Sequence, residues 1–319
     1  MGELGFDSTG VSVSNIKIQN EWQKFAINGK LGKLDTDALN VSLEKFDVGN
    51  FNVLLQKTGL ELGGSVTGQA KLTAIYGNFS FISDLQVDSF VLNNHLIGSG
   101  LIANRWLPES KGVEMNALLK HDGIDGLAVN GEYFPQSEEE NYNLDVSFDG
   151  IPVSAFEHYL DKMVTELEGT ASAEITIKGK TKAPLLNGYV SLDKTVLMVD
   201  YLNTSFVVSD TVLVRPDGFY MEQAAASDIN GKEGSITGYL KHDNFKKWRF
   251  DAAVTADNFL ALNTNGAMNS LYYGKAYASG LVRLSGEPSD MFLDMKLKTE
   301  RGTRFHIPLD GTKTVAESD

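Results

Sequence analysis

A short phrase centred on glycine recurs about every hundred residues, and this period constrains the fold more than any single motif does. The copies span residues 27–31, 129–133 and 236–240, and their central glycines lie 102 (131 − 29) and 107 (238 − 131) residues apart. We interpret each copy as a strand, a turn and a strand. A fixed period is typical of a repeat architecture, in which each unit buries its apolar face by stacking on the next unit. We therefore expect the function to lie on a shared, extended surface.

A second correspondence relates the first two units over a longer stretch. Five pairs of positions share one separation of 105 residues (148 − 43): Leu43/Phe148, Val48/Val153, Phe51/Phe156, Leu62/Leu167 and Gly64/Gly169. Apolar residues at 156, 159, 160, 163, 164 and 167 predict an amphipathic helix over 152–167 that covers one end of a curved sheet. The residues Val48, Phe51, Leu54 and Leu55 predict a shorter helix one unit earlier. In the third unit, residues 258–263 show no helical pattern and stay unassigned.

The rest of the chain alternates between apolar and polar residues, as strands do. Such strands have one apolar and one polar face, which is typical of antiparallel sheets. We predict an all-β fold with one or two short helices: an elongated, curled antiparallel sheet with a β-taco-like groove, built from repeats of about 105 residues (148 − 43). Residues 1–319 would form one elongated array with units 26–127, 128–234 and 235–319, of which the last is truncated.

The composition excludes several classes of partner. The 319 residues include 42 acidic and 28 basic ones, for a net charge of −14. Nucleic acid needs a basic stripe, so we expect no nucleic-acid partner, and the charge also disfavours an anionic membrane surface. Cysteine is absent, which excludes disulfides and thiolate metal sites. No apolar run reaches the roughly 20 residues that span a bilayer, and no signal peptide is recognisable. We expect a fragment of a longer protein.

Catalytic and metal-binding patterns are missing from the sequence. The five histidines, at positions 95, 121, 158, 242 and 306, are scattered and have no metal-ligand spacing. No nucleophile elbow, phosphate-binding glycine loop or EF-hand is present. We therefore expect no enzymatic activity, no cofactor and no metal site.

Several stretches of the chain resemble the TamB family of translocation and assembly module proteins, which belongs to the AsmA-like superfamily. They are residues 28–48, 64–72 and 85–94, and residues 276–286 and 299–309 resemble the family's bacteroidete members. The resemblance implies a protein of Gram-negative bacteria that is anchored in the inner membrane and whose repeats span the periplasm as a curled sheet with a hydrophobic groove. It also implies transport of phospholipid, a role in outer-membrane biogenesis and an outer-membrane TamA-like partner. This chain departs from the complete family pattern because an inner-membrane anchor and a partner-binding segment are not recognisable in it.

The alternation and the resemblance together suggest a groove for lipid, although a closed apolar core also satisfies the alternation. We predict that acyl chains lie along the apolar face while headgroups stay at the rim. Burial contributes about 0.8 kcal/mol for each methylene, so one acyl chain supplies about 10 kcal/mol before ordering costs. The predicted lining residues are those on the apolar side of clear strands: Val41, Leu43, Val66, Ala70, Leu72, Phe79, Phe81, Val146, Phe148, Ile175, Ile177, Val282, Leu284, Met291, Leu293, Met295 and Leu297.

Two other functions stay open. The chain would act as a chaperone-like scaffold if its sheet edges paired with strands of outer-membrane proteins or autotransporters. It would act as an adhesin or a carbohydrate-binding protein if Tyr272, Tyr273 and Tyr277 formed an exposed aromatic cluster, but strand packing also explains these three residues.

Overall fold

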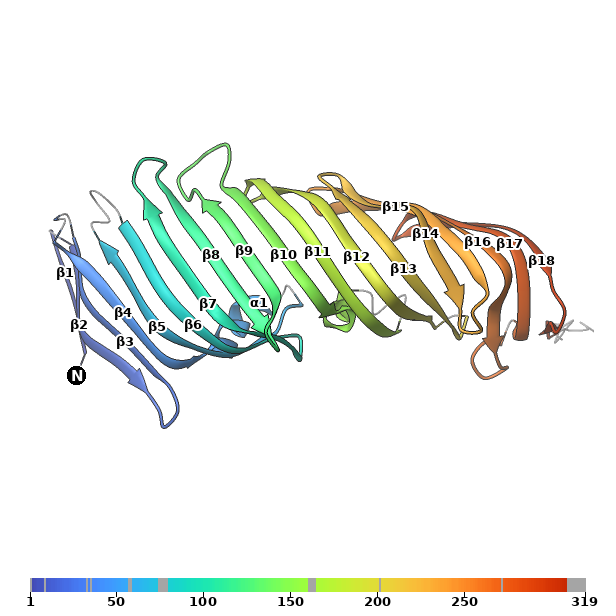
Figure 1. The fold of residues 1–319 in the computed structure, drawn as a ribbon, viewed down its shortest axis with the longest axis horizontal. Helices are drawn as coiled ribbons and strands as arrows, with labels where there is room; N and C mark the ends of the chain where they lie inside the picture. Colours follow the sequence, from blue (N-terminus) through green and yellow to red (C-terminus); the bar gives the residue numbers. More distant parts are fainter. Residues whose placement is uncertain are drawn as a thin grey trace, which may run out of the picture.

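A computed structural model describes residues 2–8, 10–32, 34, 36–56, 59–73, 80–159, 165–200, 202–270 and 272–308. In this part of the chain, 19 strands form one antiparallel sheet that is not closed (Figure 1). Strands β1 to β17 each pair with the next strand along the chain, and β19 pairs with β17 beyond the end of β18. The prediction of an elongated, curled antiparallel sheet is therefore confirmed.

The strands follow one another with short connections. They are β1 (Glu3–Asp7), β2 (Gly10–Gln19), β3 (Lys24–Gly32), β4 (Ala38–Asp47), β5 (Leu62–Thr73), β6 (Ser80–Leu92), β7 (His95–Leu107), β8 (Gly112–His121), β9 (Ile124–Tyr133), β10 (Tyr142–Pro152), β11 (Thr165–Lys180), β12 (Ala183–Val199), β13 (Thr204–Arg215), β14 (Gly218–Asp228), β15 (Glu233–Asp243), β16 (Lys246–Thr264), β17 (Tyr273–Glu287), β18 (Asp290–Thr299) and β19 (Arg304–His306).

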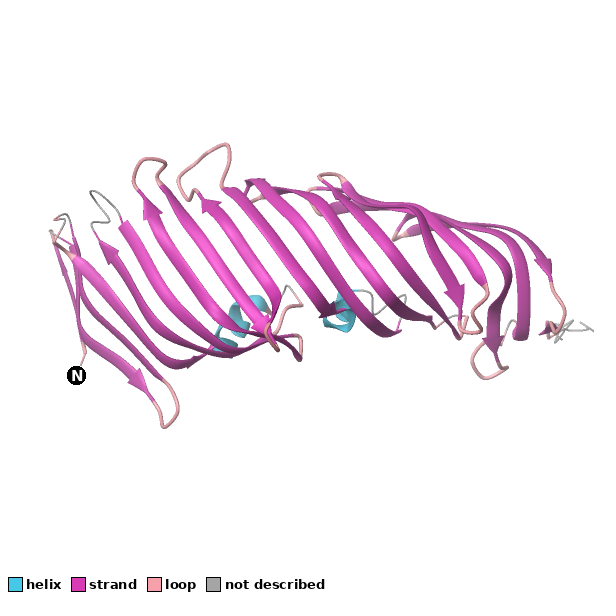
Figure 2. Cartoon of the chain, viewed as in Figure 1, coloured by secondary structure: helices cyan, strands magenta, loops and turns pink. Residues whose placement is uncertain are grey.

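Short helical segments follow β4 and β10, as predicted, but the second is shorter than expected (Figure 2). After β4 come the 3₁₀ helix η1 (Val48–Phe51) and the α-helix α1 (Asn52–Leu55). After β10 comes the 3₁₀ helix η2 (Val153–Tyr159), and residues 160–164 lie outside the described residues. The predicted helix up to residue 167 is wrong at its end, because Thr165 already pairs with Met198 of β12. Sheet pairing over-rides the helical spacing there.

The third unit has a strand where the first two have a helix. Residues 258–263, which the sequence left unassigned, belong to β16 and pair with β17. Phe259 and Leu260 are buried there, and the ring of Phe259 stacks on Phe206 at 6.0 Å between centroids. The extended β16 thus supplies the apolar contacts in this unit.

The recurring glycine lies inside a strand and not in a turn, so the interpretation as strand, turn and strand is wrong. Gly29, Gly131 and Gly238 occupy β3, β9 and β15, six strands apart each time. Gly29 and Gly131 have φ of 127° and 138°, and a Cβ on them would lie 1.9 Å and 2.1 Å from a carbonyl oxygen of the next strand. Only glycine permits so close an approach of two backbones. The exact unit boundaries stay a prediction.

A row of β-bulges bends the strands. Register shifts in β2, β4, β6, β10, β12 and β16 each contain a residue with positive φ. At each bulge that residue's backbone N–H donates to a side-chain oxygen of the adjacent strand at 2.8–3.1 Å. The donor and acceptor pairs are Asn15/Asn28, Lys45/Thr67, Ser89/Ser99, Gly150/Ser172, Lys194/Ser209 and Asn258/Ser279. Bulges bend a strand and increase its twist, so the row accounts for the curl.

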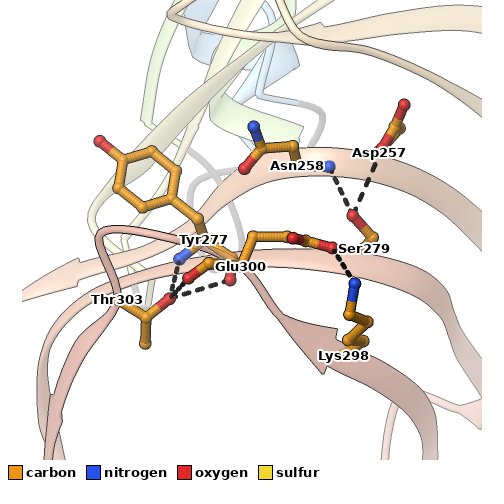
Figure 3. A network of polar contacts seen from close by, with 7 residues as sticks. All are labelled: Asp257, Asn258, Tyr277, Ser279, Lys298, Glu300 and Thr303. Carbon is orange, nitrogen blue, oxygen red and sulfur yellow. Dashed lines mark hydrogen bonds and ion pairs between the residues drawn. The ribbon is translucent and has the colours of Figure 1, made fainter.

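The turn between β18 and β19 continues this bend to the edge of the sheet (Figure 3). The Tyr277 carbonyl, two residues from Ser279 on β17, accepts the Glu300 N–H at 2.8 Å. The Thr303 hydroxyl accepts the Tyr277 N–H at 3.0 Å and donates to the Glu300 carbonyl at 2.8 Å. These bonds hold the turn against β17, where the edge strand changes direction.

The carboxylate of Asp228 connects β14 to β16 through a hydrogen bond to Leu260. Its side chain is 1% exposed and accepts the N–H groups of Asn230, Lys232 and Leu260 at 2.8, 2.9 and 2.8 Å. Burial raises the pKa of this carboxyl, but the hydrogen bonds from Leu260, Lys232 and Asn230 outweigh burial and bring the pKa below its ordinary value. Leu260 is itself buried, so its N–H depends on this acceptor.

Replacing Asp228 with Ala removes the acceptor of the buried Leu260 N–H and of the N–H groups of Asn230 and Lys232. Since each buried unsatisfied group costs about 1–3 kcal/mol, we expect a loss of about 3 kcal/mol of unfolding free energy. Urea unfolding and hydrogen exchange at the Leu260 amide measure this. The exposed, ion-paired Asp84→Ala serves as control and changes stability by about 1 kcal/mol or less. Unchanged exchange at Leu260 in D228A would contradict the assignment.

The lowered pKa of Asp228 also predicts acid sensitivity. The folded pKa lies below the unfolded one, so the stabilisation is complete above about pH 5 and disappears as the pH falls through the folded value. We expect the urea midpoint of the unmodified chain to fall more steeply between about pH 5 and pH 2 than that of D228A. Parallel curves for the two proteins would show that Asp228 does not contribute.

Candidate functional site

One row of directly opposed residues crosses the sheet from β2 to β18 and contains only apolar residues and glycine. Opposed residues of an antiparallel pair project from the same face, so the row defines a single surface, which we name the apolar face. The row consists of Ile18, Phe25, Leu43, Gly68, Leu85, Ile102, Ala117, Val129, Val146, Ile175, Gly188, Val214, Phe219, Leu240, Phe250, Gly286 and Met291.

Every described residue of the predicted lining lies on the apolar face. Four of them belong to the row itself: Leu43, Val146, Ile175 and Met291. The others occupy alternate positions of the same strands, and Phe79 lies outside the described residues. The residues on β4, β5, β6, β10, β11 and β17 are half-buried, whereas Met291, Leu293, Met295 and Leu297 of β18 are exposed. The structure thus brings the predicted residues onto one surface, and their contact with lipid stays a prediction.

The apolar face also includes residues that the sequence did not single out. Phe25 lies opposite Leu43, Val87 opposite Val66 and Val129 opposite Val146. The signal that identifies them is the strand register, which depends on partners far along the chain. Local alternation alone does not show which of these residues oppose one another.

The helical segments cover one end of the apolar face. Ala155 of η2 packs against Ile97 and Ile151, and Val153 packs against Leu167 and Ala171. The ring of Phe51 in η1 lies 5.9 Å from that of Phe46 on β4. In Figure 2 the helices lie at the same end of the strands. This end is therefore closed by packing, while the predicted lining residues of β4, β5, β6, β10, β11 and β17 are half-buried and those of β18 are exposed.

Ser83 and Asn104 form one of the polar pairs on the apolar face. Ser83 on β6 lies opposite Asn104 on β7, and the Asn104 amide nitrogen donates to the Ser83 hydroxyl at 2.8 Å. Ser83 is 1% exposed, and among the described residues the Oδ1 atom of Asn104 has no hydrogen-bond partner. The Ser83 hydroxyl and the Asn104 amide therefore satisfy each other's hydrogen-bonding groups, and neither side chain carries a charge.

The pairs with shifted pKa around β14–β17 lie on the opposite, polar face. The Tyr220 hydroxyl donates to Asp217 at 2.6 Å, and burial together with this bond raises the pKa of Tyr220 to about 12. The guanidinium of Arg283 hydrogen-bonds to Asp251 and lowers the pKa of that carboxyl. The described residues include no cluster of potential metal ligands. These ion pairs stabilise the outer surface.

The C-terminal part of the sheet identifies a family. Residues 222–319 match the TamB C-terminal domain, from within β14 through β19. This similarity of the C-terminal region supports membership of the TamB family. The match confirms the resemblance drawn from the sequence and supports a general role in outer-membrane assembly or transport, in association with the bacterial envelope. No curated protein and no solved structure shows a significant match. Among the described helices of the chain, none has the length and hydropathy to cross a membrane.

The Ser83–Asn104 pair generates a prediction about the apolar face. Ser83→Ala leaves the Asn104 amide nitrogen without its acceptor, and we expect a loss of about 1–3 kcal/mol. The double variant Ser83→Ala/Asn104→Leu removes both polar groups, and we expect it to recover most of this loss, since replacing both partners by apolar groups is nearly neutral. Urea unfolding of the two single variants and the double variant measures the coupling. Additive losses would contradict the mutual dependence.

Proposed function

We propose that the apolar face of this chain shields the acyl chains of phospholipid as lipid passes through the periplasm between the inner and outer membranes. The observation that supports this proposal is the uninterrupted row of apolar residues and glycine from Ile18 to Met291. Neighbouring strands lie about 4.8 Å apart, so the row extends over about 75 Å. A continuous surface of this kind offers lipid a path without a charged barrier in that row.

An apolar surface without specific contacts allows a bound lipid to move along it. Each buried methylene contributes about 0.8 kcal/mol wherever it lies along the row, so displacement along the face changes the free energy little. No polar contact has to form or break at each step, and headgroups stay in water at the rim. We infer a non-enzymatic role that requires no cofactor and supports outer-membrane biogenesis.

The parent protein, in this proposal, is anchored in the inner membrane and meets an outer-membrane TamA-like protein. The family supports a partner in the outer membrane in general terms. Such a bridge is consistent with an elongated sheet whose apolar row extends across most of its strands.

A second function, a chaperone-like scaffold for outer-membrane proteins or autotransporters, is favoured by one observation. All residues of β18 are exposed, so an extended segment of a client could pair with this edge. Proline substitutions in β18 would abolish that function and leave lipid contact along β4 to β17 intact. The tyrosines considered for an adhesin are half-buried, and Tyr273 stacks on His306 at 5.2 Å, which agrees with packing between β17 and β19.

A charge on the apolar face tests the lipid proposal. Leu43→Glu places a carboxylate in the row, and we expect several-fold less co-purified phospholipid by native mass spectrometry, because lipid would have to cover a charge. Ser42→Glu, which adds the same charge to the exposed polar face of the same strand, is the matched control and retains lipid. Photocrosslinking residues at Leu43, Ile175 and Leu284 are expected to label lipid. Absence of co-purified lipid and of labelling at all three positions would refute the proposal.

A further inference from the structure

One end of the apolar face is held closed by hydrogen bonds between units. We name it the covered end, and it is the end where η1, η2 and the last residues of β16 lie. Asn93, in the turn between β6 and β7, donates from its amide nitrogen to the Ala155 carbonyl of η2 at 2.7 Å. Ala155 is 1% exposed and packs with Ile97 and Ile151. The segment after β10 therefore reaches back across the sheet to β7 and β6.

The third unit closes the covered end in an equivalent way. Asn203, in the turn between β12 and β13, donates from its amide nitrogen to the Asn263 carbonyl at 2.5 Å. The Asn263 N–H donates in turn to the Leu202 carbonyl at 2.9 Å. The two asparagine turns lie 110 residues apart (203 − 93), and the two acceptors lie 108 apart (263 − 155). The end of β16 thus takes the place of η2, and its Phe259 and Leu262 are buried.

Aromatic side chains gather at the opposite end of the apolar face, which we name the aromatic end. Successive opposed residues on β7 to β10 there are Trp106, Val113, Tyr133 and Tyr142. They lie four residues beyond the apolar row (106 − 102 and 133 − 129), an even number, so their side chains share the apolar face. The rings of Tyr133 and Tyr142 stack at 5.4 Å between centroids, and both residues are half-buried. In Figure 1 the turns that follow β7 and β9 lie at the opposite end of the strands from α1.

The third unit has a second aromatic group at the aromatic end. The ring of Phe219, a member of the apolar row, lies 6.2 Å from that of His242, which lies 4.9 Å from the ring of Trp248. His242 and Trp248 flank the turn between β15 and β16. Tryptophan and tyrosine favour the boundary between hydrocarbon and water, because an apolar ring carries a polar N–H or O–H. The rings therefore indicate where the apolar part of a bound ligand ends and its polar part begins.

The span between the two ends fits an acyl chain. Val87 and Leu119 are 1% and 3% exposed, and both oppose residue 100 of β7 in a row near the covered end. This row lies six residues from the aromatic residues (106 − 100 on β7 and 119 − 113 on β8). Six residues span about 20 Å at 3.3 Å each, and the hydrocarbon of one bilayer leaflet is about 15 Å thick. The uncharged Ser83–Asn104 pair lies within this span. An acyl chain that begins at the aromatic end thus stops before the packed residues.

We propose that phospholipid binds the apolar face in one orientation, with headgroups along the aromatic end at Trp106, Tyr133 and Tyr142 and with acyl chains directed along the strands to the covered end. This inference rests on the proposed function and adds the direction of the bound lipid. The reverse orientation would press the headgroup against packed apolar residues such as Ala155 and leave its polar atoms without partners, which is costly.

Quenching of tryptophan fluorescence by brominated lipid tests the orientation, because bromine quenches only at short range. The chain contains three tryptophans, and Trp22→Phe with Trp248→Phe leaves Trp106 as the single reporter at the aromatic end. The full chain is loaded with phosphatidylcholine that is brominated either near the headgroup or near the end of the acyl chain, and gel filtration removes vesicles. We expect the bromine near the headgroup to quench Trp106 several-fold more strongly than the bromine near the chain end.

A matched pair of reporters on β10 measures the direction along one strand. In a chain whose three tryptophans are replaced by Phe, Tyr142→Trp and Val146→Trp place the reporter at two depths about 13 Å apart. We expect Y142W to respond several-fold more strongly to the bromine near the headgroup, and V146W to the bromine near the chain end. Asn143→Trp, on the exposed polar face beside Tyr142, is the control and is expected to respond to neither lipid.

Native mass spectrometry of the same samples separates failure of the orientation from failure of the proposed function. Bound lipid with equal or reversed quenching of Trp106 would overturn the orientation and leave the proposed function standing. Quenching of N143W as strong as that of Y142W would do the same, since lipid would then lie on the polar face. Absence of bound lipid from the chain would overturn both. Circular dichroism of each variant checks the sheet, and the Trp106 result decides the orientation if V146W does not fold.

Discussion

The register of backbone hydrogen bonds between successive strands is the constraint on which the rest of this structure depends. Side chains alternate between faces with a period of two, so a slip by one residue in any strand would move its apolar residues to the polar face. The pairing from β2 to β18 contains no such slip, and the row from Ile18 to Met291 is its product. The apolar face is a property of the register as much as of composition.

The bulges reconcile this register with a curled shape. A flat sheet of 19 strands would leave its apolar residues uncovered, whereas the curl half-buries them. At each bulge an extra residue breaks the ladder, and a serine, threonine or asparagine oxygen satisfies its N–H. The Asp228 carboxylate likewise accepts the N–H of Leu260 on β16, in the part of the third unit where a strand takes the place of the earlier helices. The bend is therefore hydrogen-bonded at many points along the sheet.

Most of the fold could be predicted from alternation and period, because both are local properties of the chain. Leu293, Met295 and Leu297 show their shared face in ten residues of sequence, and the TamB C-terminal domain confirms the family that the repeated phrases resembled. Where local pattern and sheet pairing compete, the sequence misleads. Thr165 lies in a stretch with helical spacing of apolar residues, but it pairs with Met198 of β12. Gly131 follows an asparagine, as in many turns, but it lies within a strand where two backbones approach closely.

By itself the sequence determined the one-sided strands, the period of about 105 residues and the presence of helical segments after β4 and β10, since each follows from the residue pattern of the chain. Only the tertiary structure decided that the apolar sides of successive strands join in one row and that Ser83 lies opposite Asn104 on the same face. These features arise from pairing between strands, and the hydrogen bonds that select a partner and a register are made between segments that no local pattern connects.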